Sequence, residues 1–137
     1  GIVIAVPIKS VGGGNTVAYL NGGRSPKYTP DLSCAYELII AIANEGGTDA
    51  VMNAARAAGA RGGTVLHGKG TGAKGAPKFY NISIAAEKEV ILIVSAAGQK
   101  AEIMRSILKK AGPDTPAKAI AFSLPTSEVA GFGFFDS

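Results

Sequence analysis

The chain has 137 residues, a formal net charge of +4 and a hydrophobic content of 47%, which suits one compact domain with a modest core. No apolar run approaches the roughly 20 residues that span a bilayer, so a membrane-spanning helix is not expected. Cys34 is the only cysteine, which excludes an internal disulfide and favours the reducing cytoplasm as the location.

Residues 1–20 are predicted to form a strand and a turn. Residues 1–13 resemble residues 119–131, because both read as a strand, then a proline, then a turn with valine and glycine. We therefore expect the chain to begin with the last strand of a preceding unit. Either it is a fragment of a tandem two-unit protein, or this strand pairs with a neighbouring molecule. The glycines and prolines of residues 21–35 indicate a linker, and residues 36–137 form the main domain.

The main domain contains one β-α unit twice. An aliphatic run at 37–42 precedes a helical pattern at 48–58, and a second run at 89–94 precedes a helical pattern at 100–110. One constant offset places Glu37 on Glu89. The repeat therefore predicts two equivalent strand–helix pairs, and the isoleucine- and valine-rich runs are typical of central, buried strands.

The two helices carry apolar residues at helical spacing. Thr48 is the expected N-cap of the first helix, which should end at Gly59. Gly112 and Pro113 mark the end of the second. The apolar positions are Val51, Ala55, Ala58, Ile103, Met104, Ile107, Leu108 and Ala111.

A further strand follows each helix, at 63–67 and at 118–124. The order predicts an α+β, ferredoxin-like βαββαβ fold, with both helices on one face of an antiparallel sheet and one extra strand at the N-terminus. Because the strands are so apolar, we expect another subunit to cover the other face.

Two nucleotide-binding patterns occur near the second strand, and both fail in context. Residues 63–70 almost match G-x-x-x-x-G-K-[ST], but Gly70 stands in place of the hydroxyl residue and no helix follows. Residues 70–75 match G-x-G-x-x-G, again without a following helix. What remains is a glycine-rich loop at 68–78 with three lysines, whose backbone N–H groups could face an anion. The alternative is a flexible surface loop without a ligand.

The sequence gives no indication of an enzyme. His67 has no second histidine or cysteine pair with which to bind a metal, and no nucleophile–base pair or carboxylate pair stands out. One RNA-binding module has the same topology, but it stacks bases on aromatic residues of its central strands. Residues 38–43 and 90–95 contain none, so nucleic acid is not an expected partner.

Residues 58–72 and 118–125 resemble the P-II nitrogen regulatory family, in a divergent form. This resemblance implies a homotrimeric signalling protein that binds an adenine nucleotide (ATP, ADP or AMP) in clefts between subunits. A loop after the second strand would contact a target transporter or metabolic enzyme.

The resemblance also implies roles for individual residues. Thr64 would lie near the adenine, and Lys118 would bind phosphate. The other phosphate-binding candidates are Lys69, Gly70, Thr71 and Gly72. The partner loop would span residues 71–81, with Lys74, Gly75, Lys78, Phe79 and Tyr80. Lys74 stands where the family has the glutamine used with magnesium and 2-oxoglutarate, so sensing of 2-oxoglutarate does not carry over.

Two other readings remain open at this point. The chain could be an oligomerisation module whose apolar sheet binds only other copies and whose loop has no ligand. It could also be a trimeric ferredoxin-like protein of the divalent-ion-tolerance family, which a metal titration would reveal.

Overall fold

The computed structural model describes residues 1–10, 34–71, 78–79, 82–83 and 86–131. Within these ranges, no helix is long and apolar enough to cross a membrane. The elements in chain order are β1 (Val3–Ala5), β2 (Tyr36–Asn44), α2 (Thr48–Ala57), β3 (Thr64–Gly70), β4 (Lys78–Phe79), β5 (Ile82–Ser83), β6 (Ala86–Ala96), α3 (Lys100–Ala111), β7 (Ile120–Pro125) and β8 (Glu128–Ala130).

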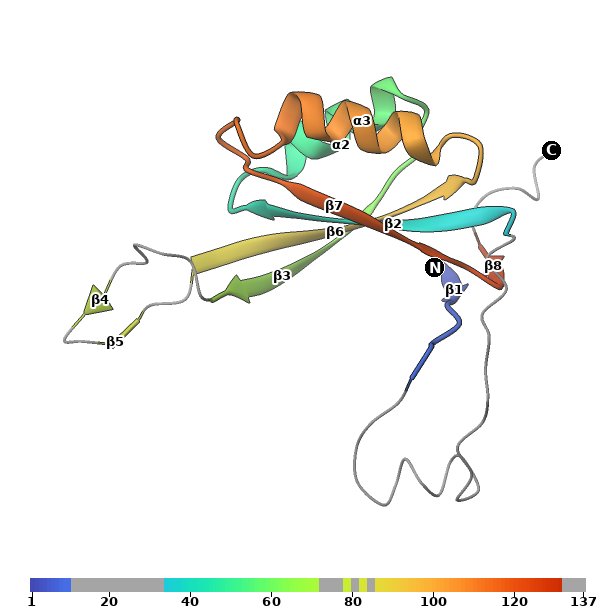
Figure 1. Cartoon of the computed structure of the whole chain (residues 1–137), viewed down its shortest axis with the longest axis horizontal. Helices are drawn as coiled ribbons and strands as arrows, with labels where there is room; N and C mark the ends of the chain where they lie inside the picture. Colours follow the sequence, from blue (N-terminus) through green and yellow to red (C-terminus); the bar gives the residue numbers. More distant parts are fainter. Residues whose placement is uncertain (11–33, 72–77, 80–81, 84–85, 132–137) are drawn as a thin grey trace, which may run out of the picture.

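Four antiparallel strands form the main sheet in the order β3-β6-β2-β7. Both helices lie on one face of this sheet, and the β4–β5 ribbon extends away from it beyond β3 (Figure 1). The ferredoxin-like α+β fold is therefore confirmed, with the two aliphatic repeat strands, β2 and β6, at its centre.

The core lies between the sheet and the two helices. Alternate residues of β2 and β6 point toward the helices, since side chains of a strand alternate between its faces. The largest side chains in this layer are fully buried, and small alanines such as Ala41 and Ala55 lie among them and let the helices approach the sheet. These large residues are Ile39, Val51, Ile91, Ile93, Ile103 and Ile107.

The N-terminus of α2 is stabilised by a residue from another strand. The N-cap residue is Gly47, which has no side chain to form a capping hydrogen bond, so the prediction that Thr48 is the N-cap is wrong. Instead the buried Glu89 carboxylate of β6 accepts hydrogen bonds from the Gly46 N–H at 2.6 Å, from the Thr48 N–H at 3.2 Å and from the Thr48 hydroxyl. A carboxylate at this end also suits the helix dipole.

The C-terminus of α2 has the expected glycine. The helix ends at Ala57, and Gly59 follows with a φ of 111°. The Gly59 N–H bonds to the Arg56 carbonyl and the Ala60 N–H to the Ala55 carbonyl, which is the Schellman arrangement. The predicted end at Gly59 was thus close.

Three details differ from the prediction. β3 continues to Gly70 and pairs with Ala86–Leu92 of β6, so Gly68 to Gly70 belong to a strand and not to a loop. Leu108 of α3 is 42% exposed and does not join the core. β1 pairs with the chain's own β8, a partner that we did not consider, with Ile4 opposite Val129.

Candidate functional site

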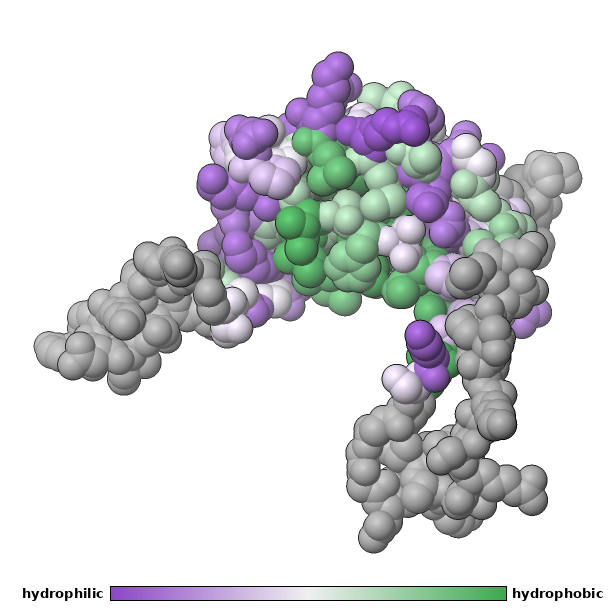
Figure 2. Space-filling view, in the orientation of Figure 1, coloured by the Kyte–Doolittle hydropathy of each residue, from purple (hydrophilic) through white to green (hydrophobic). Residues whose placement is uncertain are grey.

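The face of the sheet that the helices leave uncovered is rich in apolar side chains, and we call it the open face. Leu66 of β3 is 50% exposed there, and Ile120 and Phe122 of β7 are 52% and 42% exposed. Apolar surface also continues over α3 and β7 (Figure 2). Soluble single chains rarely expose so much apolar surface in one place, so this face is a candidate binding surface.

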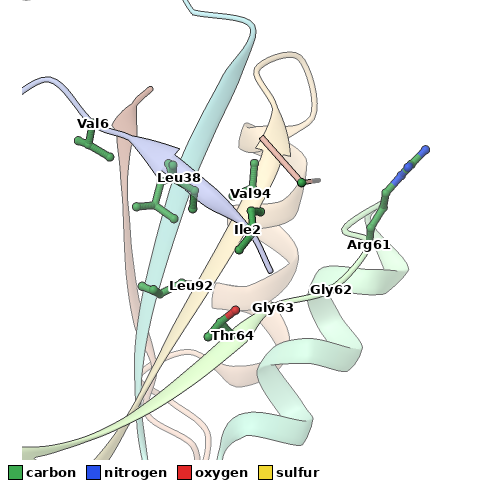
Figure 3. A pocket seen from close by; sticks show the side chains of 11 residues that line it. Ile2, Val6, Leu38, Arg61, Gly62, Gly63, Thr64, Leu92 and Val94 are labelled. Atoms are coloured by element: carbon green, nitrogen blue, oxygen red, sulfur yellow. The ribbon is translucent and has the colours of Figure 1, made fainter. Parts of the chain in front are cut away.

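A hollow of about 730 Å³ lies on the open face near the start of β3. Ile2, Ile4 and Val6 of the β1 segment line one side, and Leu38, Leu92 and Val94 of the sheet line the other. Gly62, Gly63 and Thr64 form one end, whereas the Arg61 side chain points away (Figure 3). The size and apolar lining are those of a small-molecule site.

The opposite end of the open face carries positive charge. Lys88 of β6 faces Gly68 and Asn44 in adjacent strands, and its amino group donates to Asn44 Oδ1 at 2.6 Å. A Cβ on Gly70 would lie 2.8 Å from Lys88 Cε, so the glycine leaves room for the lysine chain. This end lies about 13 Å from the row that contains Thr64 and Leu92, at the usual rise of a strand.

Lys118 also lies at this charged end, on the far edge of the sheet. The Ala117 carbonyl just before it accepts a hydrogen bond from the Asn44 N–H at 2.8 Å. Lys118 has a φ of 47°, in the left-handed region that residues other than glycine rarely adopt. Backbone strain of this kind is often found at functional sites.

The structure does not bring the predicted ligand residues together within one chain. Thr64, Lys69 and Gly70 are on β3, at one edge of the sheet, and Lys118 precedes β7 at the other edge. The central strands β6 and β2 separate them by about 14 Å. A compact ligand bound at one of these edges therefore does not reach the other edge of the same chain.

Lys69 is engaged with a neighbour on the helix side of the sheet. Its amino group donates to Glu87 Oε1 at 2.9 Å across the β3–β6 pair. This hydrogen bond, together with the charge of the carboxylate, raises the pKa of Lys69. The lysine is charged, but it would have to leave Glu87 to bind a phosphate on the open face.

The remaining predicted ligand and partner-loop residues lie at the end of β3 or beyond it. Thr71 is exposed just after β3. Lys78 and Phe79 lie within the predicted partner loop, but they form the short strand β4, which was not expected there. The other predicted positions, Gly72, Lys74, Gly75 and Tyr80, lie outside the described residues.

Sequence reasoning missed Lys88 and the three side chains in and beside β1 that line the hollow, Ile2, Ile4 and Val6. Lys88 could have been found, because it has the same parity along its strand as Val90, Leu92 and Val94 and so shares the open face. The role of β1 could not, because it depends on pairing with β8. Among the described residues, no group of three or more histidine, cysteine or acidic side chains could hold a metal ion.

Comparison with known proteins identifies the family and the fold. The model of the family "Nitrogen regulatory protein P-II" matches residues 36–132. The crystal structure of Arabidopsis thaliana PII bound to citrate superposes with a TM-score of 0.52, at 22% identity, over 68% of this chain and 76% of that one. A search of curated proteins finds no match. Since the family model spans most of the sequence, the chain belongs to the nitrogen regulatory protein P-II family.

Proposed function

We propose that this chain is a cytoplasmic signal-transduction regulator, and not an enzyme, that binds an adenine nucleotide between copies of itself. The observation that carries this proposal is the division of the candidate site between the two edges of the sheet. One edge offers the hollow beside Thr64, and the other offers Lys118. In a closed ring of copies, edge β3 of one copy would meet edge β7 of the next.

In this arrangement the two ends of the open face have different roles. The hollow near Thr64 would hold the apolar ring of the nucleotide. Lys118, with Lys88 nearby, would hold the anionic phosphates, since charge-assisted hydrogen bonds are the strong ones. Three copies in a ring would also bury Leu66, Ile120 and Phe122, which one copy leaves exposed.

Binding would regulate a partner protein through the segment between β3 and β6. Gly70 at the end of β3 and Lys88 at the start of β6 flank this segment and lie in contact with each other. A phosphate held at this point would favour one conformation of the segment, and so change the affinity for a target transporter or enzyme of nitrogen or related metabolism.

Calorimetry with ATP, ADP and AMP tests the nucleotide part of the proposal. We expect saturable binding of at least one of them by the assembled protein. Lys118→Ala should weaken that binding about tenfold or more, since a hydrogen bond to a charged group is worth roughly 1.5–3 kcal/mol. No heat with any of the three, in a folded oligomer, would refute nucleotide binding.

The exposed apolar residues of the open face support a second candidate, an oligomerisation module without a ligand. Limited trypsin digestion separates the two. A nucleotide that slows cleavage at Lys69, Lys74 and Lys78 supports the regulator, whereas cleavage at an unchanged rate supports the module.

A further inference from the structure

The hollow beside Thr64 has one wall that does not come from the main domain. This wall consists of Ile2, Ile4 and Val6, which alternate along the β1 segment and line the hollow together with Leu38, Leu92 and Val94 of the sheet. Figure 3 shows Ile2 and Val6 on the β1 segment and the three sheet residues beside it. Val3, between two of them, is 70% exposed and lies on the opposite side of the strand. The alternation is that of a strand with one face on a pocket and the other on solvent.

The position of this wall is set by the C-terminal strand. Ile4 is paired with Val129 of β8, and the Ser127 N–H donates to the Ala5 carbonyl at 2.9 Å. Gly131, which has a φ of 83°, lies directly against the backbone of Gly1 at the start of the chain. A Cβ there would lie 2.3 Å from the Gly1 carbonyl oxygen. Any larger residue at Gly131 would therefore push the start of β1 aside.

The lining determines what kind of group the hollow can hold. Both walls are aliphatic, the Thr64 hydroxyl is the polar side-chain group on the sheet side, and Arg61 points away. Such a lining offers apolar contact area and few side-chain hydrogen bonds, since Gly62, Gly63 and Gly131 contribute only backbone groups, so it suits the apolar face of a flat ring. A charged group would lose its hydration here without compensation.

We propose that β1 is the specificity-determining wall of the nucleotide site, with Ile4 at its centre. This inference rests on the proposed function and adds that a segment outside the matched domain closes the ring pocket. The chain's own N-terminal strand then covers the adenine ring, while the phosphates extend outside the wall to the charged end of the next copy's open face.

Ile4→Ala tests the wall, with Val3→Ala as the matched control on the other side of the same strand. The probes are adenosine and ATP, measured by calorimetry. We expect Ile4→Ala to weaken both about tenfold, through lost apolar contact, and Val3→Ala to leave both within about twofold. Lys118→Ala should weaken ATP and leave adenosine unchanged. None of these β1 residues belongs to the core, so the variants keep the fold.

Gly131→Ala displaces the wall without changing a side chain of β1, and Gly98→Ala, where nothing lies within 4 Å of the added carbon, is its control. We expect weaker adenosine binding only in the first. A binding-independent readout comes from tryptophan, which the chain lacks. Ile4→Trp should emit at shorter wavelength than Val3→Trp.

The outcomes separate this inference from the proposed function. If the unchanged protein binds no nucleotide, the proposed function fails and the wall fails with it. If it binds ATP but Ile4→Ala and Gly131→Ala bind as tightly as it does, only the wall is refuted. Equal emission wavelengths for Ile4→Trp and Val3→Trp would also refute it. An Ile4→Trp variant that loses assembly but keeps its affinity for adenosine would show that another copy, and not a ligand, fills the hollow.

Discussion

The two faces of the sheet are built from similar aliphatic residues, but they differ in how deeply those residues are buried. Ile91 and Leu92 are neighbours on β6, yet Ile91 is fully buried under the helices and Leu92 lines the hollow on the open face. Both are aliphatic, and neither face would be recognised from composition. On the helix face the large side chains of the central strands β2 and β6 are buried, whereas on the open face several apolar side chains stay exposed. We infer that one face stabilises the fold and the other binds copies and ligand.

The largest difference between the faces should be in stability. Ile91→Ala should lower the free energy of unfolding by about 3 kcal/mol, because it leaves a cavity in a closed core. Leu92→Ala should cost about 1 kcal/mol, since its side chain already borders an open hollow. Urea unfolding followed by circular dichroism measures both. Equal losses would mean that the faces are packed alike.

Glu89 is the next largest contributor on the helix face. Glu89→Ala should cost about 2–3 kcal/mol, because it removes a buried charged acceptor and leaves the Gly46 and Thr48 N–H groups without their partner. Glu87 lies two residues before Glu89 on the same face of β6 but is exposed, so Glu87→Ala is the control and should have little effect. The contribution is absent if both variants unfold at the same urea concentration.

The Glu89 carboxylate should also make the free energy of unfolding depend on pH in the acidic range. The Thr48 hydroxyl, and then the Gly46 N–H, hold the pKa of Glu89 below its ordinary value of 4.5. The unfolded chain therefore takes up this proton first as the pH falls. The stabilisation is present above about pH 4.5 and is lost as the pH falls toward the lowered pKa. Unfolding of Glu89→Gln between pH 6 and pH 3 should show a shallower dependence than that of the unchanged protein.

A charge on the open face should affect assembly more than folding. Phe122→Asp should reduce the native mass from an oligomer to a single chain, because burial of an unpaired carboxylate between copies is costly. Its far-ultraviolet circular dichroism should stay unchanged. Lys109→Asp, on the last turn of α3, is the control. An oligomer that survives Phe122→Asp would place the interface elsewhere.

The smallest effect is expected for Lys69→Ala. Its ion pair with Glu87 is exposed on both sides, and such pairs contribute little to stability. The midpoint of thermal unfolding should stay within error of that of the unchanged protein. A clear drop would show that the end of β3 is held more firmly than its exposure indicates.

The internal repeat made most of the fold predictable. Glu37 and Glu89 occupy equivalent positions, and each contacts the first residue of the helix from the other unit, Lys100 at 3.5 Å and Thr48 respectively. The aliphatic strands and the spacing of Ile103 and Ile107 predicted the core correctly. These features are local, so a single sequence contains them.

Apart from Leu108, which lies on the exposed side of α3, the errors concern contacts between distant segments. Gly68 to Gly70 look like a loop by composition, and only pairing with β6 makes them a strand. Glu89, which lies on β6, takes the place of a local N-cap for α2. β1 pairs with β8, which lies at the other end of the sequence. For the candidate site, the resemblance named residues on two edges. The sequence alone did not show that these edges are separated by the whole width of the sheet.

Mixing two defective variants tests this division most directly. Thr64→Phe should block the hollow, and Lys118→Ala should remove the phosphate lysine, so each alone should bind ATP poorly. In co-assembled oligomers of both, about one quarter of the sites would combine an intact edge from each copy. The account predicts that the mixture recovers high-affinity binding at that fraction of sites. A mixture that binds no better than its two parents would contradict a site shared between copies.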